Sequence, residues 1–166
     1  MTITISETTL QQAASEGMDA FVGAVINAIK QGIGGELSAN NMHLLNSQQI
    51  TLLGWQLLHD EVMDGGFIQL IHNQLGPFIF LNPLAKALRQ WGMKDLSKLL
   101  YTGRELYDRY GSELERERTD DEFMALFEQY PQFDELDDEF VENEEDWTAL
   151  IAHYIDEHID QFIKCI

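Results

Sequence analysis

The chain has 166 residues, 45% of them hydrophobic, which suits one globular domain with a sizeable core. Its 29 acidic and 10 basic residues give a formal net charge of −19, so nucleic acid and anionic membrane surfaces are expected to repel it. There is no apolar run long enough to span a bilayer and no signal-peptide pattern, and the single cysteine, Cys165, cannot form an internal disulfide. We therefore expect a cytoplasmic protein that does not contact membranes.

The first third of the chain predicts one long helix. After a loose or short extended start over residues 1–8, apolar residues recur at spacings of three and four from Thr9 to Gln31. The glycines that follow Gln31 would end this helix. We expect residues 36–46 to form a connector, with room for a short helical turn after Ser38.

Residues 48–75 predict two helices joined by a hinge at Asp64-Gly65-Gly66, because glycine accepts the left-handed backbone that ends a helix. The hydroxyl of Ser47 can cap the first helix, which is apolar around most of its circumference and is therefore expected to be central. Polar residues also occur among these apolar neighbours; they are Glu61, Gln69 and Asn73. If buried, they must be hydrogen-bonded, for example to the open backbone of the hinge; a ligand pocket is the alternative.

The middle of the chain predicts a loop and two helices. Residues 76–82 are apolar but short and bounded by proline, so we expect a buried loop. The Asn82-Pro83 pair is a helix start signal, and the helix would continue to Trp91. A further helix is expected over residues 94–110, with Gly103 inside it at a point where another helix packs closely.

The carboxyl-terminal part predicts more helices. Thr119-Asp-Asp-Glu122 fits a capping box for a helix that ends near Tyr130, and the last helix is expected from Glu144 to Ile163. There is neither an internal repeat nor a convincing strand pattern. The predicted fold class is therefore all-α, a single-domain bundle of about seven or eight helices over residues 1–166.

The most unusual segment is the acidic strip, residues 134–146, which holds nine acids and no base. The nine are Asp134, Glu135, Asp137, Asp138, Glu139, Glu142, Glu144, Glu145 and Asp146. Phe133, Leu136, Phe140 and Trp147 recur at spacings of three, four and seven, so the strip is anchored on the core, unlike a disordered acidic tail. A helical strip would span roughly 20 Å with about one charge per 2.2 Å, against about one per 1.7 Å in duplex DNA.

Motifs of catalysis or of cofactor and metal binding are absent from the sequence. Gly32-Ile-Gly-Gly lacks the spacing of a phosphate-binding loop, and no serine lies in a Gly-x-Ser-x-Gly turn. His153 and Glu157 are four residues apart and could converge, but there is no His-Glu-x-x-His motif and no cysteine pair. We predict a protein that is not an enzyme, with no catalytic residues, cofactor or metal.

Residues Trp55 to Asn73 contain the motif Glu61-Val62-x-Asp64-Gly65-Gly66-Phe67-x-Gln69, followed by Asn73. With weaker matches over Leu84–Tyr110 and Phe133–Phe140, the chain resembles a family of small bacterial helical proteins that includes a DNA mimic of about this size and acidity. That family usually has asparagine where this chain has Asp64, and either residue suits the turn. The resemblance implies an all-helical, dimeric protein that binds a DNA-binding regulator and blocks its DNA surface.

We therefore predict a DNA mimic in which the nine acids of the acidic strip stand in for phosphates. The predicted partner is a basic DNA-binding protein, a helix-turn-helix transcription regulator, and direct contact with nucleic acid is not expected. One alternative is an immunity or antitoxin-like protein that neutralises a basic toxin. Others are an enzyme or metal binder around His153 or His59, and acids that only keep the protein soluble.

Overall fold

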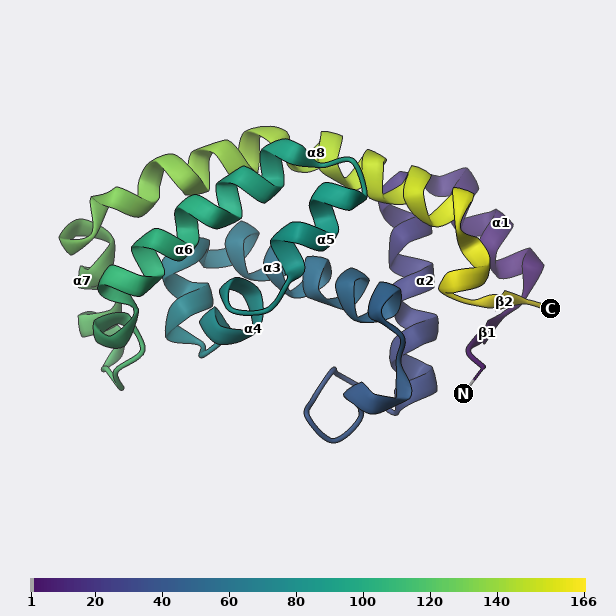
Figure 1. The fold of residues 1–166 in the computed structure, drawn as a ribbon, viewed down its shortest axis with the longest axis horizontal. Helices are drawn as coiled ribbons and strands as arrows, with labels where there is room; N and C mark the ends of the chain where they lie inside the picture. The colour runs from purple at the N-terminus through teal and green to yellow at the C-terminus, as the bar shows by residue number, and fades with distance from the viewer. Residues whose placement is uncertain (1) are drawn as a thin grey trace. The chain divides into compact units, whose positions relative to one another are not determined.

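The computed structural model describes residues 2–166 (Figure 1). They form two compact units, the first made of residues 2–56 and 145–166 and the second of residues 57–144. The described residues contain eight α-helices and one pair of two-residue strands, so the predicted all-α class is confirmed. That residues 1–166 act as a single domain stays a prediction. No described helix combines the length and the apolar character needed to cross a membrane.

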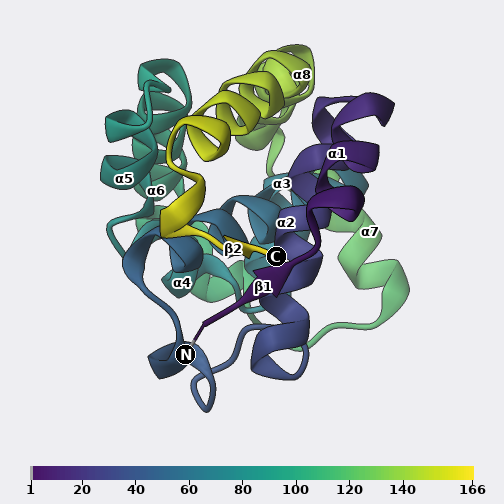
Figure 2. The ribbon, with the colours of Figure 1, turned by 90° about the vertical axis from the view of Figure 1, so that its right-hand side faces the viewer.

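Unit one joins the two ends of the chain through a short parallel strand pair. Strand β1 (Thr4–Ile5) pairs with β2 (Lys164–Cys165), and Thr4 lies opposite Lys164 (Figure 2). Strand β1 lies within the short extended start expected over residues 1–8, whereas no strand was expected at β2. Two residues are too few to produce the alternation from which a strand is recognised.

The long helix predicted over residues 9–31 is two helices, α1 (Glu7–Glu16) and α2 (Met18–Ile33). Gly17 separates them with φ 134° and ψ 171°, a conformation that only glycine adopts readily. The prediction failed because the apolar spacing continues across Gly17, and a single glycine is tolerated inside a helix. Helix α1 has no fully buried side chain, whereas α2 supplies seven to the core of unit one.

Helix α3 (Ser47–His72) begins in unit one, and its cap is Asn46 instead of the predicted Ser47. The N–H of Gln49 donates to Asn46 Oδ1 (2.8 Å), and the N–H of Asn46 donates to Gln49 Oε1 (3.0 Å). These two bonds form a reciprocal capping box. The connector before α3 contains the expected helical turn, the 3-10 helix η1 (Met42–Leu44).

The predicted glycine hinge lies within α3, in unit two. Gly65 (φ −144°, ψ 16°) and Gly66 (φ 74°, ψ −176°) leave the helical conformation, so the element is two helices joined by a kink, as expected. The rest of the chain forms α4 (Gly76–Phe80), α5 (Leu84–Gln90), α6 (Lys94–Leu114), α7 (Asp120–Gln129), η2 (Pro131–Phe133), α8 (Asp134–Glu157) and η3 (Ile159–Gln161).

Four predictions in this part need correction. Residues 76–80 form a short helix where a loop was expected. Asn82 Nδ2 donates back to the carbonyls of Pro77 (3.4 Å) and Phe78 (3.3 Å), so it closes α4 and does not cap α5. Helix α6 continues past residue 110 to Leu114, and residues 134–157 are one helix, not a strip followed by a separate helix.

Two other predictions are confirmed. The capping box of Thr119 and Glu122 is present at the start of α7. A Cβ on Gly103 would lie 2.8 Å from the Phe80 ring, so α4 and α6 pack closely at this glycine. Phe80 in turn lies beside Phe67, with ring centroids 6.2 Å apart, and Phe67 contacts Phe140 edge to face. These buried rings form the centre of unit two.

Candidate partner-binding surface

Seven of the nine predicted acids have exposed side chains on α8. They are Asp134, Glu135, Asp138, Glu139, Glu142, Glu145 and Asp146. At about 100° of rotation per residue they cover a sector roughly 140° wide, opposite the buried side chains of Leu136, Phe140 and Trp147. One helix thus holds the seven carboxylates on one side, and we call this surface the acidic face.

The acidic face consists of two rows along the helix. One row is Asp134, Asp138 and Glu145, and the other is Glu135, Glu139, Glu142 and Asp146. About 90° of rotation separates the rows, which corresponds to roughly 8 Å at a helix radius of about 5–6 Å. Neighbours in the longer row are about 4.5–6 Å apart along the axis. Two lines of phosphates that border a minor groove about 6 Å wide present negative charge on a comparable scale.

The carboxylates of the acidic face have no cationic partner within the described part of the chain. Among residues 2–166, none of the seven forms an ion pair or a side-chain hydrogen bond. Carboxylates held side by side on a helix repel one another, which lowers the stability of the fold. The surface is therefore available to a cationic partner that would relieve this repulsion.

Asp137 faces inward and supports the hinge in α3. Its Oδ1 accepts the N–H of Phe67 at 2.8 Å, at the point where the helix resumes after Gly66. Burial, opposed by this hydrogen bond and reinforced by the neighbouring charges of Asp134 and Asp138, raises the pKa of Asp137 from its ordinary value of 3.8 to about 6. A Cβ on Gly66 would overlap the Asp137 carboxylate, so glycine is required there for space as well as for its positive φ.

Glu144 is the second acid that does not belong to the acidic face. Its Oε1 lies 2.7 Å from Nε2 of His59, and Nδ1 of that histidine lies 3.2 Å from Oδ1 of Asp60. The side chains of His59 and Glu144 are 28% and 21% exposed. Glu144 thus connects α8 to α3 within unit two, and its position is explained by this contact without any partner.

The polar residues of the hinge bind one another. Glu61 Oε2 accepts from Gln69 Nε2 and from Asn73 Nδ2, both at 3.0 Å, and Gln69 Nε2 also donates to Asp64 Oδ2 at 2.8 Å. These residues are hydrogen-bonded although none is fully buried: Glu61 and Gln69 are half-buried and Asn73 is exposed. Their partners are side chains on either side of the kink and not its open backbone. The Gly-Gly-Phe motif and the acidic strip therefore meet at one place, where Asp137 caps the second half of α3.

Comparison of the sequence with known proteins identifies the family of this chain. The family model described as DMP19-like protein matches residues 43–158 of the chain. The chain is also 32% identical over 161 residues to the DNA mimic protein DMP19 of Neisseria meningitidis serogroup B (strain ATCC BAA-335 / MC58), which covers 96% of this chain and 94% of that protein. The chain belongs to the DMP19-like protein family. The family resemblance of the sequence is thereby confirmed.

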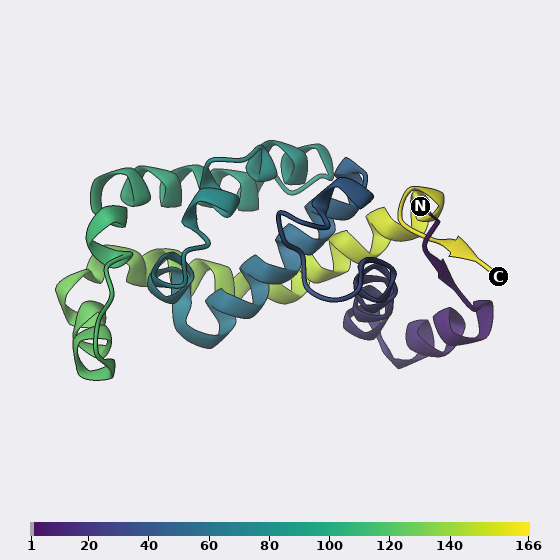
Figure 3. The ribbon, with the colours of Figure 1, turned by 90° about the horizontal axis from the view of Figure 1, so that it is seen from below.

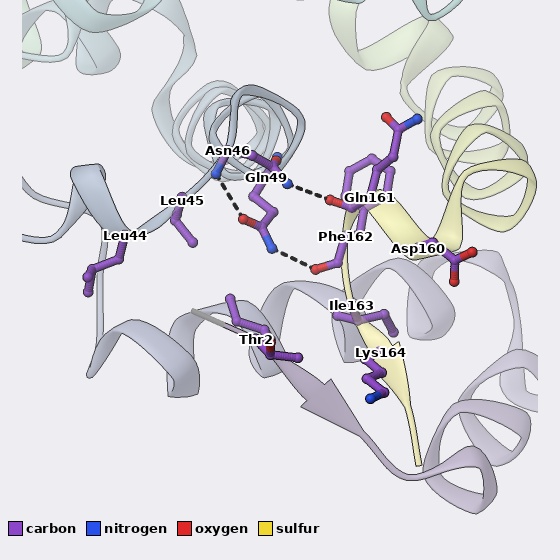
Figure 4. A pocket seen from close by; sticks show the side chains of 11 residues that line it. Thr2, Leu44, Leu45, Asn46, Gln49, Asp160, Gln161, Phe162, Ile163 and Lys164 are labelled. Atoms are coloured by element: carbon purple, nitrogen blue, oxygen red, sulfur yellow. Dashed lines mark hydrogen bonds between the residues drawn. The ribbon is translucent and has the colours of Figure 1, made fainter.

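This member of the DMP19-like family also has a cavity of about 410 Å³ in unit one (Figure 4). Gln49 forms part of its wall, and its Nε2 donates to the carbonyl of Phe162 at 2.8 Å. The nearby Asn46 Nδ2 donates to the carbonyl of Gln161 at 2.8 Å. The wall includes no histidine or cysteine, and no three metal-ligand side chains within residues 2–166 are placed to hold an ion.

Seven of the nine acids predicted to bind a partner lie on the acidic face, whereas Asp137 and Glu144 lie at the edge of the buried side of α8. Asp137 follows the buried Phe133 by four residues, and Glu144 follows the buried Phe140 by four. Residues four apart lie on the same side of a helix. The spacing that identified the apolar stripe therefore also indicated that these two carboxylates lie at its buried edge.

Proposed function

We propose that this chain is a DNA mimic whose acidic face occupies the DNA-binding surface of a basic protein. The observation that carries the proposal is the pair of carboxylate rows on α8, exposed and without a cation in the described chain. Membership of the DMP19-like family supports it, because the Neisseria relative is named a DNA mimic protein. Such a role requires binding and not catalysis.

Charge density supports the same reading. Seven charges over roughly 20 Å are about one per 2.8 Å, which lies between about 3.4 Å for a single DNA strand and about 1.7 Å for both strands. A surface that binds phosphates through Lys and Arg would therefore meet a similar number of anions. Asp137 and Glu144 are left out of the proposed contact because each is engaged within unit two.

The proposed partner is a DNA-binding transcription regulator of the helix-turn-helix type in the cytoplasm, and its operator binding is blocked by competition. The proposed active form is a homodimer. Association through opposite charges is fast and weakens steeply as salt screens the charges. In this proposal the seven acids of the acidic face contact the regulator, and the hinge of α3 only stabilises the fold.

A capture experiment tests the proposal. The immobilised chain is compared with a variant in which four acids of the acidic face are neutralised: Asp138→Asn, Glu139→Gln, Glu142→Gln and Glu145→Gln. A matched control neutralises four exposed acids elsewhere: Glu16→Gln, Glu105→Gln, Glu117→Gln and Glu128→Gln. Both variants change the net charge equally.

We expect wild type and control to retain a DNA-binding protein from lysate of the source organism at about 50 mM salt, and to lose it at about 0.5 M. The face variant should retain none at either salt concentration while its helical circular dichroism is unchanged. Equal capture by the face variant and the control would show that another surface binds. Capture of a basic toxin instead of a DNA-binding protein would favour an immunity role.

A further inference from the structure

Helices α3 and α8 lie side by side in unit two, next to the acidic face. Nε2 of His59 lies 2.7 Å from Oε1 of Glu144, and the N–H of Phe67 donates to Oδ1 of Asp137 at 2.8 Å. Residue numbers rise along α3 as they fall along α8, so the two helices are antiparallel here. Figure 3 shows the stretch of α3 before its kink alongside the first half of α8. The ring centroid of the buried Phe140 lies 6.4 Å from that of His59 and 6.3 Å from that of Phe67, so this ring fills the space beneath the two contacts.

Two exposed apolar side chains lie opposite each other between these contacts. Met63 is midway in sequence between the two α3 residues that make them, and it is four positions after the first. Val141 lies between the two α8 residues, four positions after one and three before the other. Residues three or four apart share one side of a helix, so each side chain is on the side of its helix that faces the other. Met63 is 42% exposed and Val141 is 53% exposed. We call this pair the apolar seam.

On α8 the apolar seam continues into the acidic face. At about 100° of rotation per residue, Val141 lies about 40–60° outward from Asp137 and Glu144. It lies about 20–60° from Asp134 and Asp138, which belong to the nearer row of the acidic face. Val141 is therefore an exposed apolar side chain at the border of that row.

Carboxylates also lie on the α3 side of the apolar seam. Asp60 is three residues before Met63, Asp64 directly follows it, and both side chains are exposed. Asp60 Oδ1 lies 3.2 Å from Nδ1 of His59, and Asp64 Oδ2 accepts from Nε2 of Gln69 at 2.8 Å. The apolar seam thus has carboxylates on both helices beside it.

This combination resembles what a DNA duplex offers to a protein. A single exposed apolar side chain is common and needs no explanation, but two of them opposite each other among carboxylates form a small surface of mixed character. Proteins that read DNA contact phosphates through Lys and Arg, and they contact thymine methyl groups through apolar side chains. The seam presents the methyl groups of Met63 and Val141 beside carboxylates, so it offers both kinds of contact.

We propose that the apolar seam receives an apolar side chain of the DNA-binding partner, while lysines or arginines beside that side chain contact the acidic face. This inference rests on the proposed function. It extends the contact to Met63 of α3, and it requires a partner whose DNA-reading surface has an apolar side chain among basic ones. The thioether of Met63 is flexible and polarisable, which suits it to such a contact. Interfaces place apolar contacts inside a rim of charged ones, where the exclusion of water strengthens both.

Fluorescence anisotropy with two labelled helical peptides of about 16 residues tests the seam. Both peptides carry four arginines on one side, and the central position of that side is leucine in one peptide and glutamine in the other. We expect wild type to bind the leucine peptide at least about tenfold more tightly at about 50 mM salt. Met63→Gln/Val141→Thr should bind both peptides as wild type binds the glutamine peptide. The matched control Leu81→Gln/Met124→Gln removes exposed apolar side chains elsewhere in unit two and should keep the preference.

Val141→Glu separates the apolar contact from attraction between charges. The change adds a carboxylate beside the acidic face and removes half of the apolar seam. We expect the leucine peptide to bind this variant more weakly than wild type, whereas the glutamine peptide should bind it at least as tightly. Tighter binding of both peptides would show that charge alone governs the surface and would overturn the proposal. Circular dichroism checks that each variant is folded.

Three other results would also overturn the proposal. They are failure of wild type to bind either peptide, equal affinity for the two peptides, and a preference that survives Met63→Gln/Val141→Thr. Sedimentation velocity adds a fourth, because conversion of a wild-type dimer into monomers by this double variant would assign the seam to a second copy of the chain.

The peptide test and the capture experiment fail separately. Capture of a DNA-binding protein by wild type together with equal affinity for the two peptides would refute the seam and leave the mimic role intact. A preference for the leucine peptide without capture of any DNA-binding protein would refute the mimic role and leave the seam as a binding site.

Discussion

Replacement of Asp137 by alanine should destabilise unit two through the hinge of α3. The change removes the acceptor of the Phe67 N–H, and Phe67 is 0% exposed, so water cannot easily take its place. Loss of a helix cap costs about 0.5–2 kcal/mol, and an unpaired buried N–H about 1–3 kcal/mol. Removal of a half-buried charge near Asp134 and Asp138 offsets part of this. We expect a net loss of about 1–2 kcal/mol at pH 7.

The assay is urea unfolding followed by circular dichroism, with thermal unfolding as a second measurement. For a chain of this size about 1 kcal/mol corresponds to roughly 2–4 °C, so Asp137→Ala should lower Tm by about 2–8 °C. Asp138→Ala is the matched control, because it removes the same charge one residue away from an exposed position. The control should be no less stable than wild type, and the loss of repulsion from Asp134, Glu135 and Glu142 should make it slightly more stable. If both variants have equal stability, the carboxylate of Asp137 does not cap the hinge.

The raised pKa of Asp137 gives the same contact a pH signature. A carboxyl with a folded-state pKa of about 6 and an ordinary value of 3.8 binds its proton more tightly in the folded state. Its contribution to stability is therefore complete below about pH 3.8 and is lost as the pH rises through about 6. Asp137→Asn keeps an oxygen acceptor but cannot titrate. Its stability relative to wild type should rise between pH 4 and 6.5, and a constant difference would contradict the assignment.

Three further substitutions test the hinge, the cap and the acidic face by urea unfolding. Gly66→Ala should cost about 2–3 kcal/mol, because φ is 74° and the Cβ overlaps a carboxylate, whereas Gly92→Ala (φ 101°, open space) should cost less. Asn46→Ala should cost about 1 kcal/mol and Ser47→Ala should cost less. Glu142→Gln should stabilise by about 1 kcal/mol, because four exposed acids lie three or four residues from it, yet it should weaken partner capture.

Local signals in the sequence predicted the helix cap at Thr119 and the hinge in α3, because contacts between residues close in sequence determine both. Thr119 and Glu122 accept each other's backbone N–H groups, and they are only three residues apart. The positive φ of Gly66 favours glycine, so the Gly-Gly pair in the sequence indicated the hinge. The failures have equally physical causes. Gly17 separates two helices although the apolar spacing continues across it. The position of Asn82 before a proline predicted a cap for the helix that follows, but its side chain donates to a carbonyl of the helix that precedes it.

The candidate site was only partly predictable for a different reason. The acidic strip is contiguous in sequence, so its charge is visible at once, and helical spacing indicates that Asp137 and Glu144 lie at the buried edge. The groups that they bind lie in α3, distant along the chain, and the sequence alone does not identify them.

Different side chains of α8 support the fold and form the proposed binding surface. Asp137 is tied to the Gly-Gly-Phe motif and is constrained by packing. The carboxylates of the acidic face form no ion pair or side-chain hydrogen bond within the described chain, and their mutual repulsion lowers its stability. A protein could lose those acids and keep the bundle, so the motif identifies the family, whereas the exposed charge marks the surface that we propose binds a partner. A surface that costs stability without supporting the fold is the kind of feature that selection for binding maintains. In this chain the carboxylates of that surface are arranged in two rows, and this arrangement, more than the net charge, is the property that a phosphate-binding partner would recognise.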